Sequence, residues 1–213
     1  MIKLSYSSIS NYLQCPRKFK EVNVDYRFKD GSFATKKGED IHKKIEEYIL
    51  GLSDTPPVEG HQVIENLRAM AKLEAPEGFS TGVEQMFAVD INGNKVEYKS
   101  PDAVLRGKID AYVVTPSRMV VFDWKSGKRR DNRMQATAYE ILAGSLAPDR
   151  PHDFIFDYLK DGRDPAIQVS KEDKDNFWKI IHKIQDADVF PEKPSPLCAW
   201  CPVPKAFCKY KKE

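Results

Sequence analysis

Apolar side chains recur at helical spacing in several stretches of the chain. The clearest stripe has its members at i, i+4, i+7 and i+8: Ile41, Ile45, Tyr48 and Ile49. It predicts a helix over about residues 33–50, which Gly51 ends. Ser7 or Ser8 is the expected N-cap of an earlier, shorter helix that ends near Cys15, because Pro16 disfavours helix in the residue before it. Such patterns predict helices over about residues 7–15, 33–50, 62–73, 132–146 and 170–184.

The middle of the chain changes to strand-like patterns rich in β-branched and aromatic residues. Strands are predicted at 83–91, 104–114, 119–124 and 154–159, with a further short one at 167–169. Asn92-Gly93 is a hairpin signal after the first of them. The order of elements therefore predicts an α/β (α+β) fold in which helices flank a small, mostly antiparallel sheet.

Composition restricts the class of protein. The 213 residues are 41% hydrophobic, 31% charged and 11% aromatic, as in a globular domain with its own core. No apolar run approaches the roughly 20 residues of a membrane span, and the N-terminus lacks a secretory h-region, so we expect a cytoplasmic protein with reduced cysteines. The net charge of +2 does not by itself indicate nucleic-acid binding.

Two aspartates are expected to face each other in the central hairpin. If Thr115–Arg118 is a four-residue turn, Val114 pairs with Met119, and the same register sets Asp110 opposite Asp123. Like charges at that spacing destabilise a sheet unless something bridges them, and a divalent cation is the natural bridge. Lys125 falls on the same face by alternation. The plainer interpretation is an ordinary solvated sheet face.

Three short motifs favour the functional interpretation. They occur in the order Gly107-Lys108-Ile109-Asp110, Asp123-Trp124-Lys125 and Gln135-Ala136-Thr137-Ala138-Tyr139. This order resembles the G-x-x-D, (D/E)-x-K and Q-x-x-x-Y motifs of RecB-like nucleases in the PD-(D/E)xK superfamily. His42, upstream on a helix, matches the helical histidine of that family.

The resemblance implies a restriction-endonuclease-like core and a set of roles. Asp110 and Asp123 would bind a divalent metal with His42 and the backbone carbonyl of Trp124. Lys125 would orient or activate the attacking water. Gln135 and Tyr139 would hold the motif strand or touch the substrate, and Glu84 is either a further acidic contributor or an exposed strand residue. Oxygen ligands suit Mg²⁺ or Mn²⁺, and an imidazole shifts the preference toward Mn²⁺.

The cysteines divide into one near the start of the chain and three near its end. They are Cys15, Cys198, Cys201 and Cys208. This division resembles the split set that holds a 4Fe-4S cluster in iron-sulfur RecB-like nucleases, including the CRISPR-associated exonuclease branch. Spacing alone also fits a structural Zn²⁺ site, and unligated cysteines are a third reading. The resemblance implies one nuclease domain over residues 1–213, in which segments 1–20 and 191–213 together form the cluster subregion.

The function implied is a metal-dependent DNA exonuclease acting on single strands or DNA ends. A structure-selective endonuclease with the same site and a non-catalytic DNA-binding adaptor are the alternatives, and a helicase, integrase or other recombination protein is the kind of partner expected. Cations cluster after Lys125, around Cys15 and around Cys208: Lys128, Arg129, Arg130, Arg133, Arg17, Lys18, Lys20, Lys205, Lys209, Lys211 and Lys212. Trp200, Phe207 and Tyr210 could stack on bases or pack around the cysteines.

Overall fold

A six-stranded mixed sheet forms the centre of the protein. The computed structural model describes residues 1–29, 33–73 and 76–211. The strands lie in the order β2-β1-β3-β4-β5-β6. Their bounds are Lys95–Val96 (β2), Ser80–Val89 (β1), Leu105–Val114 (β3), Met119–Lys125 (β4), His152–Tyr158 (β5) and Gly162–Arg163 (β6). Neighbouring strands run antiparallel except β4 and β5, which are parallel.

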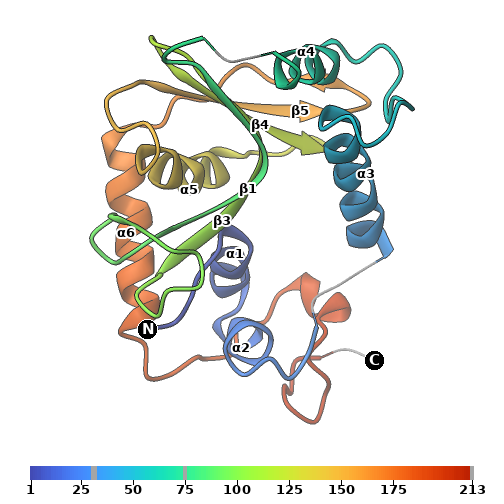
Figure 1. The fold of residues 1–213 in the computed structure, drawn as a ribbon. Coiled ribbons are helices and arrows are strands. Elements are labelled where there is room, and N and C mark those ends of the chain that lie inside the picture. Colours follow the sequence, from blue (N-terminus) through green and yellow to red (C-terminus); the bar gives the residue numbers. More distant parts are fainter. Residues whose placement is uncertain (30–32, 74–75, 212–213) are drawn as a thin grey trace.

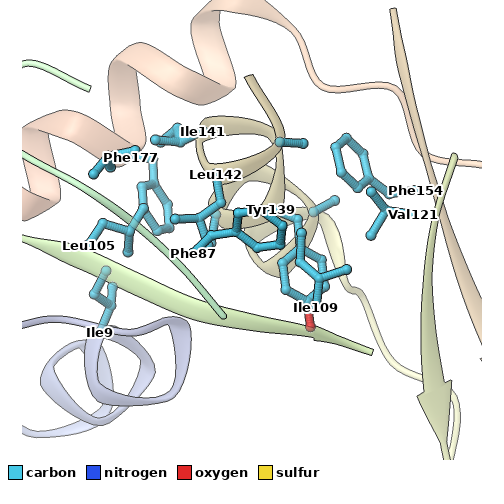
Figure 2. Close-up of a cluster of buried hydrophobic side chains, with 14 of the residues drawn as sticks. Ile9, Phe87, Leu105, Ile109, Val121, Tyr139, Ile141, Leu142, Phe154 and Phe177 are labelled. Atoms are coloured by element: carbon cyan, nitrogen blue, oxygen red, sulfur yellow. The ribbon is translucent and has the colours of Figure 1, made fainter. Parts of the chain in front are cut away.

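Helices cover both faces of this sheet (Figure 1). Helix α3 (Phe33–Ile49) and helix α4 (Gln62–Ala71) share one hydrophobic cluster with Ala111 and Trp124 of the sheet. Helix α5 (Arg133–Gly144), helix α6 (Lys171–Gln185) and helix α1 (Tyr6–Gln14) share the larger cluster with the other side chains of β3, β4 and β5. Figure 2 shows the centre of that larger cluster, where Tyr139 and Leu142 of α5 lie among Phe87, Ile109 and Phe154.

The sequence pattern predicted most of these elements. The mixed α/β fold with helices around a small sheet is confirmed, as are the four main strands and the hairpin at Asn92-Gly93. Helix α1 begins earlier than expected, because Ser5 and not Ser7 or Ser8 is its N-cap and accepts a hydrogen bond from the Ser8 backbone. The short strand predicted at 167–169 is wrong: Ile167 forms only an isolated bridge to Phe154.

The two ends of the chain lie against each other. After α1 come a short helix α2 (Pro16–Phe19) and a π-helix (Lys20–Val24), neither of which the sequence pattern predicted. The C-terminal tail, with the 3-10 helix Pro196–Trp200, runs back over this region. The Lys193 backbone donates to the Cys15 sulfur at 3.4 Å, and the Arg17 backbone donates to the Pro191 carbonyl at 3.2 Å. The tail is therefore anchored directly at Cys15.

Over the described ranges 1–29, 33–73 and 76–211, no helix combines the length and the apolar character that a bilayer crossing requires.

Candidate metal and nuclease site

The β3–β4 hairpin has the register that the four-residue turn predicted. Val114 pairs with Met119, and the printed register continues to Ala111 with Phe122. One step further, Asp110 lies opposite Asp123, and both carboxylates are buried. Alternation also holds on the other side of the strand, where Phe122 and Trp124 stack with ring centroids 6.1 Å apart and join the α3–α4 cluster. The hairpin thus separates its acidic positions from its aromatic ones.

Asp123 is held by α5 and by the lysine two residues along its own strand. Tyr139 donates to its Oδ1 at 2.6 Å, and Gln135 Nε2 donates to the same oxygen at 2.7 Å. Lys125 Nζ lies 2.5 Å from Asp123 Oδ2 and donates to Gln135 Oε1 at 2.9 Å. The i, i+4 spacing on α5 brings Gln135 and Tyr139 onto one face, so a single helix turn fixes both the carboxylate and the lysine.

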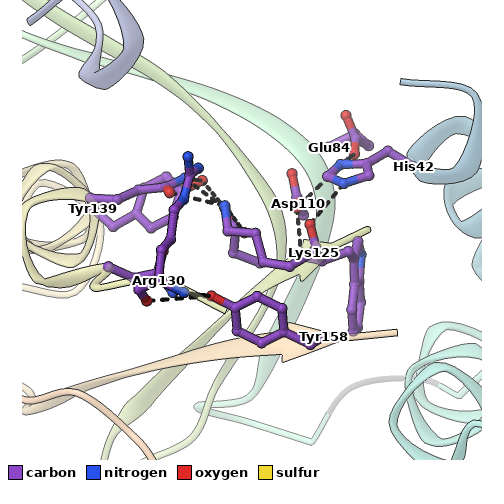
Figure 3. A network of polar contacts seen from close by, with 11 residues as sticks. His42, Glu84, Asp110, Lys125, Arg130, Tyr139 and Tyr158 are labelled. Carbon is purple, nitrogen blue, oxygen red and sulfur yellow. Dashed lines mark hydrogen bonds and ion pairs between the residues drawn. The ribbon is translucent and has the colours of Figure 1, made fainter. Parts of the chain in front are cut away.

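Asp110 instead joins a group that comes from α3 and β1. His42 Nδ1 lies 3.3 Å from Asp110 Oδ2 and 4.0 Å from Glu84 Oε1. The Trp124 backbone donates to Asp110 Oδ2 at 2.9 Å, and His42 Nε2 lies 2.9 Å from the Trp124 carbonyl oxygen. Figure 3 shows His42 and Glu84 on one side of Asp110, with Lys125 on the other.

Burial and the neighbouring charges raise the pKa of three groups in this site: Asp110, His42 and Tyr139. Burial and the negative charge of Asp123 raise the pKa of Asp110 to about 6, although His42 opposes the shift. Burial opposes protonation of His42, but its hydrogen bond to Asp110 and the surrounding carboxylates outweigh it and raise the histidine pKa. Burial raises the pKa of Tyr139 well above 10, so its hydroxyl keeps the proton that it donates to Asp123. The site concentrates negative charge that needs a cation.

The residues present fit a divalent metal. His42, Glu84 and Asp110 offer donor atoms within 4.8 Å of one another, the one such group among the described residues. The Glu84 and Asp123 carboxylates are buried, and in the described part of the chain the Lys108 and Lys125 ammonium groups pair with them. Several buried carboxylates this close together are costly unless cations neutralise them, and a divalent ion would add to the charge that the two lysines supply. Nitrogen and oxygen donors of this kind suit Mn²⁺ or a similar ion.

The assembled group differs from the predicted ligand set in two ways. Asp123 is not a member of the three-residue group, because its carboxylate is tied to Lys125 and α5. Glu84 is a member, at a backbone φ of 51° and in ion pairing with Lys108. The β1–β3 register is unchanged on the two sides of this point, with Val83 opposite Ala111 and Gln85 opposite Ile109, so Glu84 lies opposite Asp110. No local sequence signal marks the positive φ of Glu84.

All four cysteines line one cavity between the two chain ends. They are Cys15, Cys198, Cys201 and Cys208, each partly buried and none in a disulfide. They do not close into a compact metal-binding group of the kind formed by His42, Glu84 and Asp110. Burial, with Cys15 and Cys198 nearby, raises the pKa of the Cys208 thiol. The cavity brings the four sulfurs to one place and leaves space between them.

Many of the predicted basic residues are occupied by structural contacts. Arg17 pairs with Glu21, Lys20 with Asp25, Arg129 with Asp164 and Arg133 with Asp173. Lys18 is buried, Lys211 donates to two backbone carbonyls of the cysteine tail, and Lys212 lies outside the described residues. Lys128 and Arg130 are exposed and form no ion pair with the described residues. Lys128 and Arg130, which follow Lys125 closely in the sequence, are therefore available to contact a ligand.

The three aromatics of the tail have separate environments. Phe207 packs edge-on against Phe28 at 5.2 Å between ring centroids, and Tyr210 lines the cysteine cavity. Trp200 is 79% exposed. These rings do not form one stacking surface beside Asp110 and Lys125.

Comparisons with known proteins identify the family and the fold. A family profile described as "PD-(D/E)XK nuclease superfamily" matches residues 65–209. The fold is similar to that of SSO0001, at a TM-score of 0.53 and 11% identity over 100% of this chain and 89% of that one. It is also similar to a candidate exonuclease from Eubacterium rectale, at a TM-score of 0.50 and 14% identity over 93% and 86% of the two chains. A search of curated proteins gave no match.

Proposed function

The chain belongs to the PD-(D/E)XK nuclease superfamily, and we propose that it is a metal-dependent deoxyribonuclease that works as an exonuclease on single strands or DNA ends. The observation that carries the proposal is the meeting of His42, Glu84 and Asp110 beside the Asp123–Lys125 strand end. The name of the Eubacterium rectale neighbour supports exonuclease as the type of nuclease.

His42, Glu84 and Asp110 would hold the metal, with the Trp124 carbonyl and Asp123 adjoining them. When bound, a divalent ion lowers the pKa of water and stabilises charge on phosphoryl oxygens. We assign Glu84 to the ligand set because its buried carboxylate lies with His42 and Asp110 and its ion-pair partner, Lys108, is half exposed. Lys108 would neutralise the Glu84 carboxylate before metal binds and release that carboxylate to the metal afterwards.

Lys125 is the residue assigned to the attacking water. Its side chain is only 15% exposed, and its ammonium is fixed between Asp123 Oδ2 and Gln135 Oε1. Such fixed donors act without reorganisation during the reaction, which is why positioned cations are effective at a developing negative charge. Gln135 and Tyr139 are positioning residues, since they contact Asp123 and Lys125 and hold both in place.

We also propose that the four cysteines hold a 4Fe-4S cluster with a structural role. The cavity they line joins segments 1–20 and 191–213, so a cluster there would tie the two chain ends into one nuclease domain. Thiolate ligands on an iron-sulfur core stand further apart than four ligands on a single Zn²⁺, in keeping with sulfurs that surround a space. Closing a loop this long contributes about 4–5 kcal/mol in the chain-entropy model.

Colour and metal content test the cluster. Anaerobically purified protein should be brown and contain iron and sulfide, and Cys201→Ala should lower both contents and the melting temperature. Colourless protein with one equivalent of zinc would contradict the iron-sulfur assignment and leave the nuclease proposal untouched.

Cleavage of labelled DNA tests the nuclease. The wild type should degrade linear single strands or duplex ends in Mn²⁺ and stop in EDTA, and Lys125→Ala should lose activity. Lys179→Ala is the matched control, because Lys179 is a lysine of α6 that bonds only its helix neighbour Asn176. Circular single-stranded DNA separates the modes: an exonuclease leaves it intact, whereas an endonuclease opens it. Activity that survives in Lys125→Ala would refute the site.

A further inference from the structure

A cavity of about 730 Å³ opens between α1 and the segment that follows the π-helix. Its walls combine aromatic rings, amides and cations, and none of the described residues that line it is acidic. The residues that matter are Tyr6, Asn11, Asn23, Tyr26, Phe28 and Arg130. A cavity with this lining is unsuited to a metal ion and suited to a flat, polar-edged, negatively charged ligand.

Tyr26 has a strained backbone conformation, and its side chain makes no contact with the described residues that would compensate for the strain. Its φ is 52°, in the left-handed region that a bulky L-residue rarely adopts, and its side chain is 74% exposed. It makes no hydrogen bond or ring contact with any other described residue. Backbone strain that presents an unpartnered aromatic at a cavity is typical of a ligand-binding position.

Arg130 connects the cavity to the catalytic strand. The Arg130 backbone donates to the Tyr158 hydroxyl at 3.1 Å, and Tyr158 is the β5 residue paired with Lys125. Figure 3 shows this arrangement, with the Tyr158 ring reaching from β5 to the Arg130 backbone. A strand whose scissile phosphate lies at Lys125 therefore passes Arg130 on the way to the aromatic wall.

We propose that this cavity binds an unpaired nucleobase of the DNA strand, with the base stacked on Tyr26. The inference rests on the proposed function, which makes DNA the ligand. It adds a binding site that distinguishes single-stranded from double-stranded DNA. A base has a flat face for the rings of Tyr26 and Tyr6. Asn11 Nδ2 donates to Asn23 Oδ1 at 3.0 Å, and the remaining polar atoms of these two amides would meet the edges of the base. Arg130 and Lys29 supply the charge that the adjoining phosphates need. A base inside a duplex is covered on both faces by its neighbours and cannot enter.

The test compares base-bearing and abasic strands in EDTA, where metal-dependent cleavage does not occur. Fluorescence anisotropy measures binding of the full chain to a labelled oligothymidylate and to an abasic strand of equal length and charge. Base–aromatic stacking corresponds to about a ten-fold change in affinity or more. Tyr26→Ala should therefore weaken oligothymidylate binding about ten-fold and leave abasic binding unchanged. Tyr26→Phe should bind both strands like the wild type.

Trp200→Ala is the matched control, since Trp200 is a more exposed aromatic outside the cavity. The inference is refuted if Tyr26→Ala weakens both strands equally, affects neither, or is matched by Trp200→Ala. Because binding is read without cleavage, the two proposals fail separately. Normal nuclease activity without base selectivity refutes the base site alone, and base selectivity without metal-dependent cleavage refutes the nuclease alone.

Discussion

Gly107 should be intolerant of even one added methyl group. It lies on β3 under α5, and a Cβ built at this position meets Leu142 Cδ1 at 2.6 Å. Leu142 is 1% exposed and packed within the larger cluster, so its side chain has no free space to move into. Gly107→Ala must push α5 away from the sheet or force Leu142 out of its rotamer.

The magnitude follows from two opposing effects. Overpacking a well-filled core costs about 1–3 kcal/mol. Alanine is favoured over glycine in a strand interior by about 0.5–1 kcal/mol, which offsets part of that cost. The middle of these ranges leaves a net loss of about 1 kcal/mol, which lowers the melting temperature of a chain this size by roughly 2–4 °C. Because α5 also carries Gln135 and Tyr139, cleavage should slow as well.

A double-mutant cycle with Leu142→Ala identifies the cause. Leu142→Ala alone leaves a cavity and costs about 2–5 kcal/mol. In the double variant the alanine methyl enters that cavity, so the combined loss should be smaller than the sum by about 1 kcal/mol or more. Urea unfolding of the four proteins provides the free energies. The reasoning is refuted if Gly107→Ala unfolds like the wild type, or if the two losses add within about 0.5 kcal/mol.

Three further predictions concern the buried polar groups. Tyr139→Phe removes the 2.6 Å donor to Asp123 and should cost about 1.5–3 kcal/mol, read as a lower melting temperature; unchanged stability would contradict it. Mn²⁺ should raise the melting temperature more at pH 7.5 than at pH 5.5, because protonation of Asp110 near pH 6 competes with metal; Asp110→Asn should abolish the effect, and an equal rise at both pH values would count against Asp110 as a ligand. Burial opposes protonation of His152, but the 2.9 Å contact with Glu140 raises the histidine pKa above 6.5. Its contribution to stability is therefore complete at lower pH and declines as pH rises through the folded pKa; pH-dependent unfolding should show this decline in the wild type and not in Glu140→Gln.

Local pattern determined the hairpin and with it half of the site. Strand periodicity and a four-residue turn were enough to place Asp110 opposite Asp123, because side-chain parity and register follow from the turn length alone. The i, i+4 spacing of Gln135 and Tyr139 on a helix likewise follows from sequence. These relations are short-range, so no knowledge of the rest of the chain is required.

Tertiary structure decided which of those groups meet, and what else joins them. Glu84 lies opposite Asp110 through the pairing of β1 with β3 and has a positive φ, and the packing of α3 determines where His42 points. Asp123 is held by α5, and Arg129 and Arg133 pair with the carboxylates of Asp164 and Asp173, by contacts that link residues distant in the sequence. The same holds for Tyr26 and Arg130, which line one cavity although 103 residues separate them in the sequence. Distances across a fold depend on how whole elements pack, and periodicity carries no information about that packing.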